Sequence, residues 1–241
     1  MGRITHSHFI CILSVRYIMT NQDFLQTYWR QYLLLEDDFI KTISYVELSP
    51  DNYSTYSSRY LKLLLVIGSE IDVTLQVYCR QLDPTYNKET MNDYRNDIKN
   101  YELNNPQDIE SFNSQKVITY NDIQLFPWAE WYSNDTSPTW WKIYNKVKHD
   151  RVGIHEFYGT RKESYKFATL ENVLDALSAL YQIMLNLYRS IVSPSKQVKV
   201  PLRGSKLFRL SSQYWDDGQY FSDYALYVDD AGNLIKETGI I

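Results

Sequence analysis

The segment that decides the fold is Trp140-Trp141-Lys142-Ile143-Tyr144-Asn145-Lys146-Val147-Lys148-His149-Asp150-Arg151. Its apolar residues recur at i, i+3, i+4 and i+7, the spacing of one buried helical face, and they are Trp140, Ile143, Tyr144 and Val147. The opposite face carries two lysines, an amide and an imidazole: Lys142, Asn145, Lys146 and His149. The pattern predicts an amphipathic helix whose polar face is either solvated surface or a small cationic site for an anion.

Three other segments have strong helical periodicity. Residues 22–47 have a continuous apolar stripe with Asn21 placed to cap it, and residues 55–81 contain a dense apolar run. Residues 169–191 have a regular apolar stripe, with a set of polar residues opposite: Asn172, Asp175, Gln182 and Asn186. A weaker pattern covers residues 89–101. The sequence therefore predicts a mainly α fold, a bundle of four or five helices, and the scarcity of Gly, 8 residues in all, agrees with this.

Short β segments accompany the helices. Two apolar runs flanking Asn121-Asp122 predict a hairpin near residues 116–127. Alternating residues beyond 206, with a turn at 229–233, predict a small β structure near the C-terminus. We therefore expect an N-terminal extension at residues 1–20, a helical bundle domain at 21–192, and a linker with a β appendage at 193–241.

Composition sets the class of protein. The 241 residues are 44% hydrophobic and 22% charged, which is typical of a globular protein with a substantial core. The two cysteines, Cys11 and Cys79, form no disulfide framework, so a reducing cytoplasm is the expected setting. No segment approaches the length of a membrane span. His149 and His155 lack further metal ligands at suitable spacing, and we predict neither a metal site nor a cofactor.

The charge is unevenly distributed. The net charge is −4, but the stretch from Lys142 to Lys166 has seven basic and three acidic residues and is therefore +4, which leaves −8 for the remainder. A polyanion such as RNA is expected to meet the protein on this stretch. The alternative is an ordinary charged loop beside a helix.

Glu70 is placed on the apolar side of its predicted helix. A buried carboxylate needs a cation or a proton, and the candidate cations are Lys148, His149, Arg151 and Arg59. Glu70 would then either tune a catalytic group or form a structural ion pair between two helices. Asp72 lies nearer the polar boundary and needs no particular partner.

The polar face of the 140–151 segment contains the parts for metal-free phosphodiester cleavage. Imidazole suits a general acid or base because its pKa lies near neutrality, and Lys or Arg suits the phosphate. His149 with Lys142, Lys146 and Arg151 supplies these groups. The alternative is that His149, at a helix end, is a capping or surface residue.

The order of helices, with residues 145–151 on the third, resembles HEPN-type helical domains over residues 22–192. Residues 53–57, 69–72 and 144–151 also resemble uncharacterised bacterial and phage proteins. The HEPN resemblance implies a four- or five-helix bundle, often a homodimer, that acts in bacterial conflict systems as a metal-independent endoribonuclease or, after loss of activity, as an interaction domain. The family motif is Arg, often a polar residue, four to six residues and then His. Here Lys142 stands in the place of the Arg before His149, and Arg151 precedes His155 with only three residues between them. Lys lacks the planar fork of Arg, which puts cleavage in doubt.

On this resemblance the candidate catalytic residues are His149, Lys142, Asn145 and Glu70, and the candidate phosphate-binding residues are Lys146, Lys148 and Arg151. Asn145 would orient the substrate and Glu70 would support a cation. Trp128, Trp131 and Trp141 would either stack on bases or pack the core. A second hypothesis is a non-catalytic protein that binds a partner through an additional apolar face on the first helix: Trp29, Leu33 and Ile40.

Overall fold

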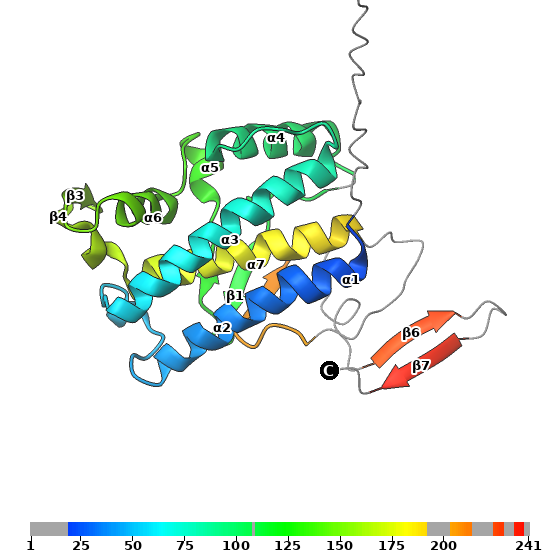
Figure 1. Cartoon of the computed structure of the whole chain (residues 1–241), viewed down its shortest axis with the longest axis horizontal. Helices are drawn as coiled ribbons and strands as arrows, with labels where there is room; N and C mark the ends of the chain where they lie inside the picture. Colours follow the sequence, from blue (N-terminus) through cyan, green and yellow to red (C-terminus); the bar gives the residue numbers. More distant parts are fainter. Residues whose placement is uncertain (1–18, 108, 192–202, 214–223, 229–233, 239–241) are drawn as a thin grey trace, which may run out of the picture.

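Three long helices form the centre of the molecule. The computed structural model describes residues 19–107, 109–191, 203–213, 224–228 and 234–238. Helices α2 (Arg30–Ile43), α3 (Ser58–Leu82) and α7 (Leu170–Ile191) run side by side, and α3 and α7 share the most extensive helix contact (Figure 1). Helix α4 (Met91–Asn104) packs on the C-terminal half of α3. The prediction of a mainly α protein with small β hairpins is confirmed.

The first helical segment is continuous from Asn21 to Ile43. It begins as α1 (Asn21–Asp23), passes through one π-helical stretch, η1 (Phe24–Trp29), and continues as α2. The predicted cap was wrong by one residue, because the Thr20 side chain accepts from the backbone N–H of Asp23 and forms a capping box with it. The apolar stripe packs inward, and Phe24, Tyr32 and Phe39 have no exposed surface.

Most of helix α7 is buried. Its apolar stripe faces the bundle as predicted, and on the opposite face Asn172, Gln182 and Asn186 are buried as well, whereas Asp175 is partly exposed. The segment around Phe112 and Gln115 covers that face and bonds to it. Gln115 exchanges two hydrogen bonds with Asn186, at 3.0 and 2.8 Å, and accepts a third from Gln182 at 3.1 Å. Paired amides can be buried because each donor finds an acceptor, and this network fixes the covering segment on α7.

The predicted hairpin at 116–127 is present and is extended by a third strand. Strand β1 (Lys116–Thr119) pairs antiparallel with β2 (Gln124–Leu125) and with β5 (Phe208–Ser211), in the order β2-β1-β5. The predicted boundary at residue 193 does not separate β5 from the bundle. The fully buried Glu36 carboxylate on α2 accepts hydrogen bonds from the backbone N–H groups of Lys206, at 3.0 Å, and Leu207, at 3.3 Å.

The remaining elements are short. A 3-10 turn, η2 (Pro50–Asn52), follows α2, and α5 (Ala129–Ser133) and α6 (Thr139–His149) follow β2. A hairpin of β3 (Ile154–Phe157) and β4 (Thr160–Glu163) leads through the 3-10 turn η3 (Ser164–Phe167) into α7. The predicted C-terminal β structure is present as the antiparallel pair β6 (Tyr224–Val228) and β7 (Leu234–Thr238). The predicted turn at 229–233 and most of the predicted extension at 1–20 lie outside the described residues.

Candidate functional site

Helix α6 has the two faces that its sequence predicts. Trp140, Ile143, Tyr144 and Val147 are at most 3% exposed, and the helix lies across α3. The crossing is close because α3 has a glycine, Gly68, directly beneath the Tyr144 ring. The polar face of α6 is therefore held rigidly outward, which is the first requirement for a site on it.

The N-terminal end of α6 is closed by Glu130 from α5. The Glu130 carboxylate accepts from the backbone N–H of Thr139 and from its hydroxyl, the latter at 2.9 Å. An anion at this position also compensates the positive end of the helix dipole. The ammonium of Lys142 lies 3.7 Å from the same carboxylate. Lys142, the residue in the place of the HEPN arginine, is thus directed to the end of α6 opposite His149.

The other two predicted catalytic residues on α6 are not joined to each other. The Asn145 amide donates to the carbonyl oxygen of Trp141 at 3.1 Å, one turn back on its own helix. His149 is the last residue of α6 and is exposed. Lys142 and His149 are seven positions apart, about 10 Å along the axis. The described residues therefore do not bring these groups together around one reacting atom.

The predicted phosphate-binding residues lie at the C-terminal end of α6. Lys146, Lys148 and Arg151 are all exposed, as is Arg161 on β4. Figure 1 shows the β3–β4 hairpin beside the end of α6. We call this group the basic end: Lys146, Lys148, His149, Arg151 and Arg161. Its basic side chains also complement the negative end of the α6 dipole, so part of this pattern has a purely structural cause.

The hairpin beside α6 was not predicted from the sequence. Its two-residue turn, Tyr158-Gly159, has positive φ at both positions, 53° and 67°, as the tight turn of a twisted hairpin requires. The Tyr158 hydroxyl donates to Asn172 of α7 at 2.9 Å. At the other end of the hairpin, the backbone N–H of Ser164 donates to Gly153 at 3.0 Å. These contacts fix the hairpin, and with it Arg161, relative to the bundle.

Glu70 lies apart from the basic end. It is half-buried on α3, and burial raises its pKa. Its carboxylate faces η1, where it adds to the effect of burial in raising the pKa of Tyr28. Among the described residues no ion pair joins Glu70 to a cation, and the candidate Arg59 instead pairs with Asp38 at 2.9 Å. The predicted pairing of Glu70 with a cation of the site is therefore not found.

Asp72, rather than Glu70, lies near a cation of the basic end. Burial raises the pKa of this half-buried carboxyl group, while a hydrogen bond with the Tyr94 hydroxyl and the nearby charge of Lys148 act in the opposite direction. The Lys148 ammonium also lies 5.6 Å from the centre of the Tyr144 ring. The expectation that Asp72 needs no particular partner was wrong, because the Tyr94 hydroxyl on α4 forms a hydrogen bond with its carboxyl group.

A group of acidic residues adjoins the N-terminal end of α6. Burial first, and then the carboxylates of Glu171 and Glu130, raise the pKa of Asp175 on α7 to about 7. The same three carboxylates add to burial in raising the pKa of Tyr158. A polyanion is repelled from this region, so the basic face of α6 is limited to its C-terminal half.

The candidate stacking residues are in the core. Trp128, Trp131 and Trp141 are 1%, 0% and 9% exposed, and the Trp128 and Trp131 rings lie 4.3 Å apart. Trp29, expected on a contact face, is 2% exposed, and its indole N–H donates to the carbonyl oxygen of Arg203 at 3.0 Å. Leu33 and Ile40 are partly buried against the core. In this structure these residues contribute to packing instead of an open surface.

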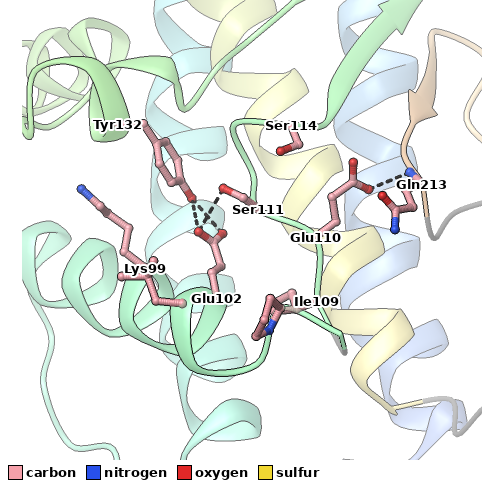
Figure 2. Close-up of a pocket in the computed structure, with 10 residues that line it drawn as sticks. Lys99, Glu102, Ile109, Glu110, Ser111, Ser114, Tyr132 and Gln213 are labelled. Carbon is pink, nitrogen blue, oxygen red and sulfur yellow. Dashed lines mark hydrogen bonds between the residues drawn. The ribbon is translucent and has the colours of Figure 1, made fainter.

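A cavity lies elsewhere, between α4, the 106–114 segment and α5. It has a volume of about 380 Å³, and Figure 2 shows Glu102, Ser111 and Tyr132 converging on one side of it and Glu110 beside Gln213 on the other. Residues of α6 do not line it. The sequence analysis missed this cavity, because Glu102 is in the weakest helical pattern and its neighbours lie in a polar segment without periodicity.

Other general classes of site find little support in the part of the chain that the structure describes. There, no cluster of three or more His, Cys, Asp or Glu side chains is arranged for a metal ion. None of the helices in this part has the length and apolar character that a bilayer crossing requires. Comparison with protein-family models, curated proteins and solved structures finds no match. The functional argument therefore rests on the geometry of this chain.

Proposed function

We propose that this protein is a HEPN-like helical protein that binds RNA through its basic end. The observation that carries the proposal is the exposure of five basic side chains on a rigid support, with Lys146 and His149 on α6 and Arg151 and Arg161 on the adjoining loop and hairpin. Exposed Lys and Arg side chains bind phosphates without any sequence requirement. The net negative charge of the rest of the chain directs a polyanion to this end.

Cleavage is the stronger form of the proposal. It requires His149 as general acid or base, with a cation from the basic end on the scissile phosphate. Lys142 and Asn145 are held by Glu130 and by the helix backbone, which favours binding without cleavage in a single subunit. A homodimer that juxtaposes two basic ends would supply a second set of cations to each His149. The chain has only two cysteines, and this low number agrees with a conflict-system role in a reducing cytoplasm.

Binding is tested by fluorescence anisotropy with a labelled single-stranded RNA. The triple variant Lys146→Glu, Lys148→Glu and Arg151→Glu reverses three exposed charges and is expected to lose most of the affinity. Its matched control reverses three exposed charges on other elements: Arg30→Glu, Lys62→Glu and Lys116→Glu. Both variants change the net charge equally, so a difference between their RNA affinities can come only from a local binding site. Equal losses in the two variants would refute a site at the basic end.

Cleavage is tested with the same RNA in the presence of a chelator. Product formation by the wild type and its loss in His149→Ala, with RNA affinity kept, would support a metal-independent endoribonuclease. If the wild type binds RNA but forms no product, the catalytic form is wrong and the binding form stands.

The second candidate is a non-catalytic interaction or scaffold protein. The contacts of Lys142 and Asn145 favour it, since they direct the lysine in the place of the motif arginine toward Glu130 and away from His149. Failure of the wild type to bind any RNA, together with a stable homodimer in sedimentation, would favour this candidate.

A further inference from the structure

The cavity beside α4 contains a buried carboxylate, Glu102, for which the described residues provide no ion pair. Glu102 is 8% exposed and accepts hydrogen bonds from three groups: the backbone N–H of Phe112 at 3.0 Å, the Ser111 hydroxyl at 3.1 Å and the Tyr132 hydroxyl at 2.8 Å. Two carboxylate oxygens offer about four acceptor positions, so three donor protons leave one position open. Burial raises the pKa of Glu102, although these bonds and the charge of Lys99 act in the opposite direction.

The lysine that lines the cavity is already engaged. The Lys99 ammonium lies 3.1 Å from the Asp135 carboxylate and donates to the carbonyl oxygen of Trp131 at 3.1 Å. It therefore compensates Asp135 more directly than Glu102. Glu110 adds a second carboxylate to the cavity, and one of its oxygens accepts from the backbone N–H of Gln213 at 2.8 Å. With Lys99 included, the charged lining residues sum to −1.

Part of the cavity lining is apolar. It is formed by Leu103, Pro106 and Ile109, and Leu103 is 77% exposed. A volume of about 380 Å³ suits a small organic molecule, and apolar lining residues with a few polar groups among them are common in such sites. The two carboxylates set the charge of the ligand, and the apolar wall favours a carbon chain over a bare ion.

We propose that this cavity binds a small organic cation, a primary amine or guanidinium group on a short aliphatic chain. Its charged group pairs with the Glu102 carboxylate and its chain lies against Ile109, while the second charged group of a diamine or of agmatine pairs with Glu110 on the opposite side. A buried carboxylate has lost hydrogen bonds with water. The charged group of the ligand replaces them with a charge-assisted hydrogen bond, which is stronger than a hydrogen bond between neutral groups. This proposal is independent of RNA binding, because residues of the basic end do not line the cavity.

The test is isothermal titration calorimetry of the whole chain with agmatine, 1,4-diaminobutane and butylamine. We expect at least one of these amines to bind, and 1-butanol, which has the same chain without the charge, not to bind. Loss of one charge-assisted hydrogen bond weakens binding roughly tenfold or more, and this is expected for both Glu102→Gln and Glu110→Gln. Glu47→Gln, at an exposed position outside the cavity, is expected to bind like the wild type.

Two further readings make the outcome unambiguous. Glu110→Gln decides the test if Glu102→Gln fails to fold, because Glu110 is only partly buried. Affinity is also expected to increase as the pH rises through the raised pKa of Glu102, since only the ionised carboxylate attracts the amine. Absence of binding by all three amines, equal binding by the two cavity variants and the wild type, or tighter binding of Mg²⁺ than of the amines would overturn the proposal.

Discussion

The contact between Gly68 and Tyr144 gives a sharp prediction, because two physical effects oppose each other there. Gly→Ala inside a helix ordinarily stabilises by about 1 kcal/mol. At Gly68, however, an added β-carbon would lie 2.6 Å from Cε2 of Tyr144, and Tyr144 is 3% exposed. Forcing extra volume into a packed core costs about 1–3 kcal/mol and sometimes more. The ring is also confined by Trp141, whose ring centre lies 4.9 Å away, so we take the upper end of that range.

Gly68→Ala should therefore lower the free energy of unfolding by about 2 kcal/mol, which corresponds to about 4–8 °C in Tm for a chain of this length. Urea unfolding measures it, with Ser69→Ala, at the exposed neighbouring position, as the control expected within about 0.5 kcal/mol of the wild type. In a Tyr144→Ala background the clash is absent, and Gly68→Ala should then stabilise by about 1 kcal/mol. A stabilising effect of Gly68→Ala in the wild type, or additive effects of the two substitutions, would refute this account of the α3–α6 contact.

Two other predictions concern buried carboxyl groups. Glu36→Ala removes the acceptor of the Lys206 and Leu207 N–H groups and should lower the free energy of unfolding in urea by about 3 kcal/mol. It should also speed hydrogen exchange of the β5 amides. Unchanged exchange in β5 would contradict the role of Glu36. Asp175 has its pKa raised from 3.8 to about 7, so its ionisation opposes folding: the penalty is absent below about pH 4, grows to about pH 7 and is complete above it. Asp175→Asn should therefore raise Tm at pH 8 more than at pH 4, and an equal change at both values would count against it.

Periodicity predicted the elements whose pattern is decided locally. The face of α6 that contains Trp140 and Val147 is buried as its spacing requires, and the 116–127 hairpin forms where two apolar runs flank a turn. Long helices and a short hairpin are specified by neighbouring residues, so one sequence is sufficient to find them.

Tertiary contacts decided what periodicity could not. The spacing placed the polar residues of α7 opposite its apolar stripe, but it could not show that two of their amides are buried against Gln115, which is 67 and 71 positions away. Likewise, Glu70 and Asp72 are two positions apart on α3, and only the tertiary structure shows that Glu70 is near Tyr28 of η1 whereas Asp72 is near Tyr94 of α4 and the charge of Lys148. The hairpin after α6 had one local signal, Gly159 after Tyr158, in a charged stretch that hid the alternation of its strands.

The candidate site was predicted in part for the same reason. The sequence placed Lys146, Lys148, His149 and Arg151 together because one helix end and the following loop contain them. It did not reveal that Glu130 holds Lys142 at the opposite end of α6, since Glu130 comes from α5. The cavity at Glu102 depends on four separate segments, which are α4, residues 106–114, α5 and the segment of Gln213, and it has no signature in any of them.

The salt dependence of RNA affinity tests the central claim most directly. Each phosphate neutralised on single-stranded nucleic acid contributes about 0.7 to the slope of log K against log salt concentration. Neutralising three cations with Lys146→Gln, Lys148→Gln and Arg151→Gln should therefore reduce the magnitude of that slope by about 2, whereas Arg30→Gln, Lys62→Gln and Lys116→Gln should leave it unchanged. Identical slopes for these two variants and the wild type would contradict an RNA-binding site at the basic end.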